Sequence, residues 1–333
     1  MHKISQKISR IMVLVSLLVL ATMTQVASAQ NMPGSGNAMQ VSPVRSDLTI
    51  NPGETRQLTV SIQNLTKTNS EYQAIINDFV AGNGEDGQPA LILDADKYAP
   101  SHSLKRYIAK IPNVSVDAGQ TKDVKVTITV PKDAAGGGYF GAVRFAPASG
   151  TDPTKNVTLS ASVGSLILVK VPGDIVENVK LETFDVRSGK EATGGSSFFT
   201  SNKDLYAVSR FKNTGNVHEQ PFGKVVLKKG TKVLETIEIN NADPRGNVLP
   251  DSVRRFNSKL TKVGMWGSYT VEGNFGYGSS GQLVSGKTSF FVLPLLFIVL
   301  GLLLVGLVLF VIFGLPRAIK RYNQNVVRKA NRR

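Results

Sequence analysis

Hydrophobic and polar positions alternate along several short segments of this chain. In residues 56–64, Leu58, Val60 and Ile62 fall on one face, and Gln, Thr and Ser side chains fall on the other. The same period of two recurs in residues 122–130, which end before a proline. Because successive side chains of a strand point to opposite faces, this pattern predicts strands with one face buried and one face in water.

The predicted strands form two sets. Within each set, turns rich in Gly, Pro and Asn separate one strand from the next. The first set is 39–50, 56–64, 72–80, 122–130 and 139–146, with one or two helical turns at 103–111. The second set is 157–171, 175–187, 205–213, 224–228, 231–239, 254–260, 267–277 and 282–290. Many short strands of even spacing are typical of β-sandwiches. The predicted fold class is therefore all-β, with two tandem Ig-like β-sandwich domains at 38–149 and 155–289.

An uncharged apolar run follows the second set, from 290 to 315. At about 1.5 Å per residue, a helix of this length exceeds the bilayer hydrocarbon core of about 30 Å. The segment after it, 316–333, contains seven Lys and Arg residues and no acid. Since basic flanks remain in the cytoplasm, we expect a single-pass membrane protein with an extracellular N-terminal region and a cytoplasmic tail.

The N-terminal segment has the three parts of a signal peptide. A basic lead precedes the apolar stretch 11–20, and the small residues 27–29 follow it. We predict cleavage between Ala29 and Gln30, which removes residues 1–29 and leaves a flexible leader at 30–37.

The net charge of +15 depends largely on the two ends of the chain. The signal and tail segments hold ten of the 39 Lys and Arg residues and none of the 24 acids, which leaves 29 bases against 24 acids elsewhere. This mild excess does not predict a nucleic-acid partner, but it is compatible with an anionic cell-wall polymer. The chain has no cysteine, so its domains depend on packed cores rather than disulfides.

Motifs for catalysis are missing from the sequence. The mature chain has two histidines, His102 and His218, which belong to different predicted domains. Ser209 and Lys212 match S-x-x-K, but within an alternating strand rather than at a helix start. We therefore predict a protein that is not an enzyme and has no cofactor. His218 ends an Asn- and Gly-rich turn; we favour a hydrogen bond to the backbone over a titrating functional role.

Three regions are candidate ligand contacts. The first is the acidic loop 81–89, with Glu85 and Asp86; the second is the Gly-rich stretch 136–139, with Tyr139. The third is Trp266, the only tryptophan, for which a sugar contact, a position at the lipid interface and a core position all remain open.

The acidic loop has a second interpretation as a calcium site. Its oxygens, with those of a nearby acidic segment, are hard ligands of the kind calcium prefers. The spacing does not follow the EF-hand pattern, so a solvated loop is the favoured interpretation. The residues concerned are Asn83, Glu85, Asp86, Asp94 and Asp96.

A family resemblance emerges from the turn motifs. The first domain contains Val41-Ser42-Pro43, Asn51-Pro52-Gly53-Glu54, Gln63-Asn64, Asp78-Phe79, Val130-Pro131 and the run 136–143. The second contains the turn 213–218, Pro221-Phe222-Gly223 and the segment 248–252. Together with the layout of the chain, these motifs resemble the WxL-interacting surface proteins, which have a signal peptide, two β-sandwich domains, one membrane helix and a basic tail.

The resemblance implies peptidoglycan binding by the first domain and binding of another surface or host protein by the second. We thus predict a membrane-anchored binding or adhesion protein with the bilayer, a cell-wall polymer and a surface protein as partners. The strand near Pro43 and Arg45 also resembles periplasmic pilus chaperones, which are soluble. A membrane-tethered chaperone or assembly factor, and an accessory subunit of a membrane complex, are the alternatives.

Overall fold

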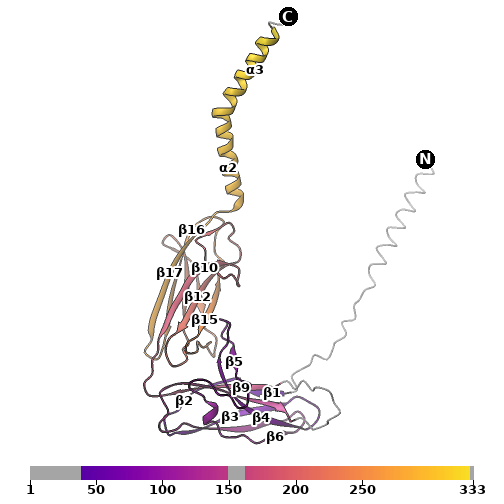
Figure 1. Cartoon of the computed structure of the whole chain (residues 1–333), viewed down its shortest axis with the longest axis vertical. Helices are drawn as coiled ribbons and strands as arrows, with labels where there is room; N and C mark the ends of the chain where they lie inside the picture. The colour runs from indigo at the N-terminus through magenta and orange to yellow at the C-terminus, as the bar shows by residue number, and fades with distance from the viewer. Residues whose placement is uncertain (1–38, 149–161, 331–333) are drawn as a thin grey trace, which may run out of the picture.

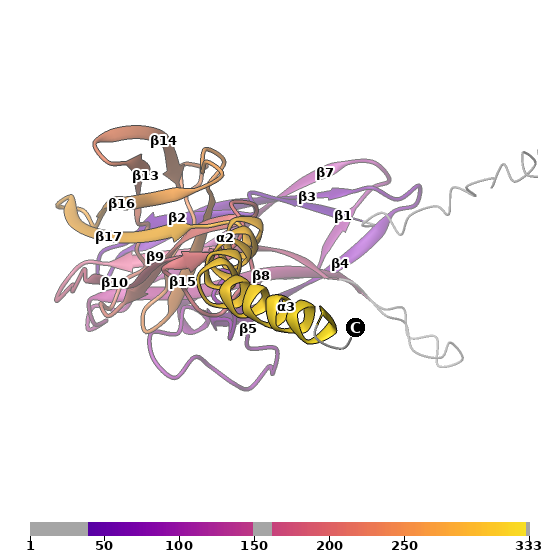
Figure 2. The same cartoon turned by 90° about the horizontal axis from the view of Figure 1, so that it is seen from above.

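The computed structural model describes residues 39–148 and 162–330. Two β-sandwich domains follow one another, and a long helix leaves the end of the second domain that is opposite the first (Figure 1). Seen from above, strands of the first domain extend to one side of the helix, so the two domains meet at a bend (Figure 2). The predicted signal peptide, its cleavage site at Ala29 and Gln30, and the leader lie outside the described residues.

The first domain consists of a three-stranded and a six-stranded sheet. The smaller sheet has the antiparallel order β1-β3-β7, with β1 (Met39–Ser42), β3 (Thr55–Asn64) and β7 (Thr121–Thr129). The larger has the order β2-β9-β8-β4-β5, with β6 also on β4: β2 (Arg45–Thr49), β4 (Ser70–Ala81), β5 (Pro89–Leu91), β6 (Val114–Val116), β8 (Gly137–Pro147) and β9 (Val163–Val171).

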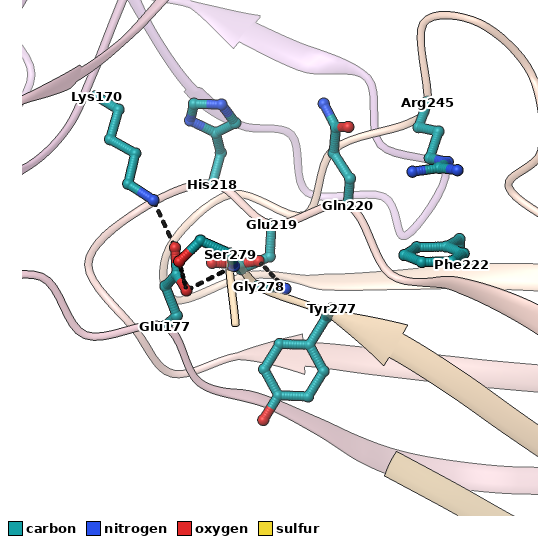
Figure 3. A pocket seen from close by; sticks show the side chains of 10 residues that line it. All are labelled: Lys170, Glu177, His218, Glu219, Gln220, Phe222, Arg245, Tyr277, Gly278 and Ser279. Carbon is teal, nitrogen blue, oxygen red and sulfur yellow. Dashed lines mark hydrogen bonds and ion pairs between the residues drawn. The ribbon is translucent and has the colours of Figure 1, made fainter. Parts of the chain in front are cut away.

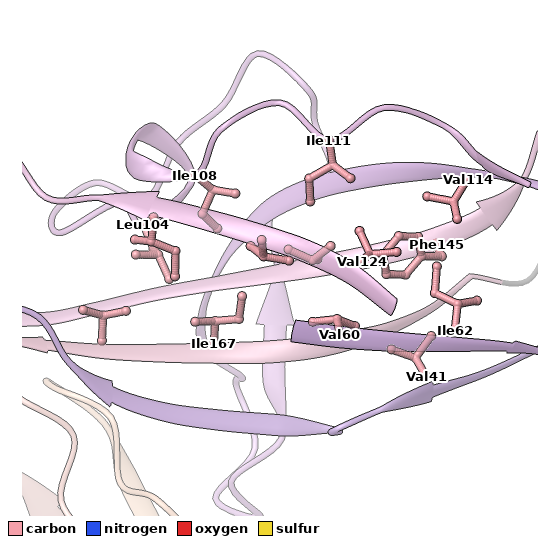
Figure 4. Packing of buried hydrophobic residues seen from close by; sticks show 14 of the residues in the cluster. Val41, Val60, Ile62, Leu104, Ile108, Ile111, Val114, Val124, Phe145 and Ile167 are labelled. Atoms are coloured by element: carbon pink, nitrogen blue, oxygen red, sulfur yellow. The ribbon is translucent and has the colours of Figure 1, made fainter. Parts of the chain in front are cut away.

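The core of the first domain confirms the alternating pattern. Val60 of β3 pairs directly with Val124 of β7 across the ladder, and Ile62 and Val126 of the same two strands are also buried. Figure 4 shows Val60, Ile62 and Val124 in this core. The predicted helical region reduces to one 3₁₀ turn, η1 (Lys105–Tyr107), whose flanking apolar residues cover one edge of this core. Burial of a branched aliphatic side chain is worth about 1.5–3 kcal/mol, so this strip is a main source of stability.

Strand β9 corrects the predicted domain boundary. Residues 157–171 were predicted to begin the second domain, but β9 pairs antiparallel with β8 and parallel with β2. Ile167, Val169 and Val171 are fully buried in the first core, where Figure 4 shows Ile167. The first sandwich is therefore completed only at Val171. The central residues of β9, Leu166–Val169, are a continuous apolar run, as is usual for a strand covered on both faces, so its sequence did not indicate which sheet it joins.

The second domain also has two sheets. The three-stranded sheet has the order β10-β12-β15, with β10 (Val179–Ser188), β12 (Leu205–Asn213) and β15 (Val253–Lys259). The five-stranded sheet has the order β11-β17-β16-β13-β14, with β11 (Phe198–Phe199), β13 (Phe222–Lys229), β14 (Lys232–Ile239), β16 (Gly267–Tyr277) and β17 (Gln282–Val292). Both predicted hairpins are confirmed, whereas the short strands β5, β6 and β11 were not anticipated.

The membrane helix begins later than predicted. Strand β17 continues through Val292, and the helix runs through α2 (Leu295–Leu309), a π-helical turn η2 (Phe310–Gly314) and α3 (Leu315–Ala330). The segment Leu295–Tyr322 is long and apolar enough to span a bilayer, and none of its most apolar window is buried against protein. Residues 290–292 extend the sheet because Phe290 and Val292 pack in the second core.

Candidate functional site: the cleft between the two domains

The two domains enclose an open cleft of about 300 Å³ (Figure 3). One lining residue comes from β9 of the first domain and the others come from the linker and the second domain. They are Lys170, Glu177, His218, Glu219, Gln220, Phe222, Arg245, Tyr277, Gly278 and Ser279. The cleft lies at a junction where the backbones are in direct contact, since Gly138 N donates to Asn216 O at 2.8 Å.

Glycine residues allow the linker after β9 to lie close against the first domain at this junction. A Cβ atom on Gly136 would lie 2.6 Å from the backbone N of Asp174 and 2.8 Å from Gly173 Cα. Contacts below 3.0 Å are essentially unknown for real Cβ atoms. The Gly-rich stretch 136–139, predicted as a ligand contact, therefore forms part of the joint between the domains.

A hydrogen-bonded network occupies one wall of the cleft. Lys170 donates to Glu177, and Glu177 Oε2 accepts from both the backbone N and the Oγ of Ser279 at 2.8 Å. Glu219 accepts from Gly278 N at 2.9 Å (Figure 3). Because the network links β9, the linker and the β16–β17 turn, it connects the two domains through charged groups.

The two carboxyl groups in this wall have opposite pKa shifts. Burial raises the pKa of Glu219 to about 7, and the nearby negative charge of Glu177 adds to the effect. Burial also acts to raise the pKa of Glu177, but the hydrogen bonds from Lys170 and Ser279 outweigh it and lower the pKa. Glu177 is therefore the ionised partner of Lys170, while Glu219 titrates near neutral pH.

His218 is almost enclosed between the domains. Burial lowers its pKa to about 4; the Asp47 carboxylate opposes this shift, whereas Arg45 and Lys170 add to it. Its Nε2 lies 3.6 Å from Asp47 Oδ1, and its ring packs edge-on against Phe140 at 5.8 Å between centroids. The predicted backbone hydrogen bond is wrong, since the buried Nδ1 has no hydrogen-bond partner. The turn prediction is confirmed: Gly215 N donates to Asn213 Oδ1 at 2.8 Å.

The opposite wall of the cleft carries a cation over an aromatic ring. The Arg245 guanidinium lies 4.1 Å from the centroid of Phe222, and Arg45 Nη1 donates to Arg245 O at 2.7 Å. The cleft thus offers a mixture of donors, carboxylates and one stacked guanidinium. Its chemistry suits a small polar group, and its charges are mostly engaged within the joint.

The acidic loop binds the second domain. Arg210 donates both Nε and Nη2 to the Glu85 carboxylate, with Nε at 2.8 Å from Oε2, and Arg255 N donates to Glu85 O at 2.7 Å. Hydrogen bonds from Arg210 lower the pKa of Glu85. Glu85 is therefore an interdomain contact, whereas the exposed Asp86 accepts a hydrogen bond from Gln88 N at 3.0 Å within the loop.

Neither Tyr139 nor the proposed calcium ligands form an open site. Tyr139 is 4% exposed, and its hydroxyl donates to Ala135 O at 3.0 Å, so the predicted ligand contact at Tyr139 does not fit the structure. Burial raises the pKa of this phenol. Within residues 39–148 and 162–330, no three His, Asp or Glu residues are grouped so as to hold a metal ion.

Trp266 lies far from the cleft, at the end of the second domain where the helix begins. Its side chain is 62% exposed, which removes the core position from the three possibilities. The cleft residues Lys170, Glu177 and Glu219 were not anticipated. They carry no local motif, because chain segments distant in sequence bring them together.

The outer face of the three-stranded sheet is the open face of the first domain. The six-stranded sheet packs Phe79, Phe140 and Leu168 against Leu249 of the second domain. On the smaller sheet, exposed Thr, Gln and Lys side chains stand in register on β3 and β7, as in the pair Thr59 and Lys125. Hydroxyl, amide and ammonium groups can hydrogen-bond to a glycan or peptide.

The fold and the helix define a class: two all-β sandwich domains in tandem with one C-terminal helix long enough to anchor them in a membrane. Residues 46–147 match the family model described as WxL Interacting Protein, peptidoglycan binding domain. The first domain is therefore similar to the peptidoglycan-binding domain of the WxL-interacting proteins, which confirms for this domain the resemblance found in the sequence. No curated protein matches the chain.

Among solved structures, the chain is similar in part to two chaperones. The class 5 fimbriae chaperone CfaA is 12% identical, with 77% of this chain and 100% of that chain covered and a TM-score of 0.37. The E. coli chaperone DraB is 13% identical, with 77% and 98% covered and a TM-score of 0.32.

Proposed function

We propose that this chain is a single-pass surface protein whose first domain binds peptidoglycan. The observation that carries the proposal is the match of residues 46–147 to a peptidoglycan-binding domain. None of the cleft residues lies within that range, so the proposal places the polymer on the first domain itself. The open face of β3 and β7 is the surface we assign to it.

The architecture supports this role. The helix leaves the second domain on the side away from the first (Figure 1), so an anchored chain holds the first domain at a distance from the bilayer. Arg317, Lys320 and Arg321 follow the apolar segment, which favours a cytoplasmic C-terminus and an extracellular first domain. Protease added to intact cells should then digest both sandwich domains; digestion of the tail alone would contradict this orientation.

Co-sedimentation of the full chain, in detergent micelles, with purified insoluble peptidoglycan tests the binding. The wild-type chain should appear in the pellet, and the double variant Thr59→Glu with Lys125→Glu should remain mostly in the supernatant, because it places two negative charges on the open face. The matched control, Thr236→Glu on exposed strand β14 of the second domain, should sediment like wild type. A wild-type chain that stays in the supernatant would refute the proposal.

For the second domain we infer another surface protein as the partner. Its five-stranded sheet ends at β14, and an edge strand can bind an extended segment by main-chain hydrogen bonds. A photo-crosslinking residue at Thr236 should capture a discrete partner in intact cells. The same residue at Gly194, in a loop of this domain, serves as the control and should not capture it.

A further inference from the structure

Several exposed apolar side chains surround the point where the helix leaves the second domain. Gly267, the first residue of β16, pairs with Val292 at the end of β17, and α2 begins three residues later. Trp266 directly precedes Gly267. The loop that contains Trp266 therefore lies beside the start of the helix, at what we call the helix end of the domain.

Four large apolar side chains at the helix end are exposed. Met265 is 64% exposed and Trp266 is 62% exposed. On the neighbouring strands, Phe198 and Phe291 are 47% and 37% exposed, and their rings stack at 6.3 Å with an interplanar angle of 17°. Exposed apolar side chains gathered at one end of a domain mark an interaction surface.

The loop is held in place by its own domain. Tyr269 donates its hydroxyl to Trp266 O at 3.3 Å, and Lys229 Nζ donates to the same oxygen at 3.3 Å. Asn202 Nδ2 donates to Val263 O at 2.9 Å. These contacts fix the loop backbone while the Met265 and Trp266 side chains project outward.

Cations are close to these apolar groups. Lys229 and Lys232 flank the tip of the β13–β14 hairpin, and Lys262 is in the tryptophan loop; all three are exposed. The nearby carboxylates are engaged: Asp204 pairs with Lys259 at 3.1 Å, and Glu235 accepts from Thr261. Tryptophan beside lysine is the combination found at membrane surfaces, where the ring lies at headgroup level and the ammonium attracts anionic lipid.

We propose that the helix end of the second domain rests on the bilayer, with Met265, Trp266 and the Phe198–Phe291 pair in the headgroup region. The inference depends on the proposed membrane anchoring, which brings lipid to this surface. A segment of only Leu293 and Pro294 separates β17 from α2, so the domain stays within reach of the lipid. The contact fixes the tilt of the second domain relative to the bilayer. Through the joint between the domains, it also fixes the distance of the first domain from the bilayer.

The single tryptophan makes the test direct. The full chain is placed in nanodiscs that contain phosphatidylglycerol and phosphatidylcholine, with and without bromine on the upper acyl chain. Trp266 fluorescence should shift to shorter wavelength relative to the unfolded chain, should be protected from acrylamide and should be quenched by the brominated lipid. The chains could instead remain bound to the discs and show the emission of a water-exposed tryptophan without bromine quenching. That result would overturn the lipid contact but not the membrane anchor.

A relocated tryptophan supplies the matched control. Leu283 is 83% exposed at the opposite end of β17, about 30 Å away at about 3.3 Å per residue. In the double variant Trp266→Phe with Leu283→Trp, the tryptophan should be open to acrylamide and insensitive to bromine. Equal bromine quenching at both positions would refute a specific contact. Failure of the chain to remain with the discs would refute the anchor as well as the contact.

Discussion

Glu85, in the loop after β4, accepts two hydrogen bonds from the guanidinium of Arg210 on β12 of the other domain. Both side chains are partly exposed, at 32% and 24%. Such a fork fixes direction as well as distance, because the two planar groups align. The loop that composition marked as a solvated or calcium-binding segment is thus a contact that sets the angle between the domains.

Loss of this contact should loosen the joint. In Glu85→Gln, the charge that pairs with Arg210 is removed, and a partly exposed ion pair is worth about 1 kcal/mol or less. Small-angle scattering of the full chain in micelles should show a broader distribution of distances and unchanged folding by circular dichroism.

The matched control for the joint is Glu191→Gln. Glu191 pairs with Arg255 at 2.8 Å inside the second domain, so its loss leaves the joint intact. Identical scattering from the two variants would mean that Glu85 does not hold the domains.

The cleft predicts two opposite pH dependences of stability. The pKa of Glu219 is raised, so its stabilising contribution is present below the ordinary pKa of 4.5 and is lost as the pH rises through about 7. The pKa of His218 is lowered, so its contribution is present above 6.5 and is lost as the pH falls toward about 4. In the wild-type chain these two slopes oppose each other between about pH 4.5 and 6.5.

Single variants should separate the slopes. In His218→Gln, the remaining Glu219 should make the melting temperature fall as the pH rises from 4.5 to 7. In Glu219→Gln, the remaining His218 should make it rise from pH 4 to 6.5. The measurement is thermal unfolding by circular dichroism across this range. The interpretation of the cleft is wrong if both variants keep the wild-type profile.

The close approach of Gly136 to the linker predicts that two glycine substitutions will differ in their cost to stability. Gly136→Ala introduces a Cβ atom 2.6 Å from Asp174 N, and relief of such an overlap typically costs about 1–3 kcal/mol. Gly194→Ala places a Cβ atom in open space and should leave stability nearly unchanged. Urea unfolding of both variants, compared with wild type, checks the difference; equal midpoints would contradict the tight joint.

The position of β9 predicts which fragment of the first domain folds. A fragment 30–149 lacks Ile167, Val169 and Val171, each fully buried and each worth about 1.5–3 kcal/mol. The combined loss is comparable to the whole stability of a typical domain, about 5–15 kcal/mol. It should therefore fail to show a cooperative thermal transition, whereas the fragment 30–171 should show one and should sediment with peptidoglycan. A cooperative transition in 30–149 would contradict the assignment of β9.

The sequence by itself determined the class of fold and most strands. Alternation is a local property of the chain, and Val60, Val124 and Val126 are buried as it predicts. The apolar helix was equally predictable, because its length and lack of charge can be read from one segment of the sequence without knowing its contacts. Its first residues were misassigned, since Phe290 and Val292 are as apolar as the helix but pack in the second core.

Only the tertiary structure decided which strands and side chains meet. The apolar residues of β9 fit either sandwich, and pairing with β8 and β2 assigns them to the first. Glu85 could not be distinguished from a solvated acid, because Arg210 is 125 residues away. The cleft arises in the same way from Lys170, Glu177 and Glu219. Alternation along the chain identifies a strand and its buried face. The pairing of strands and the contacts between domains depend on residues that are distant in sequence.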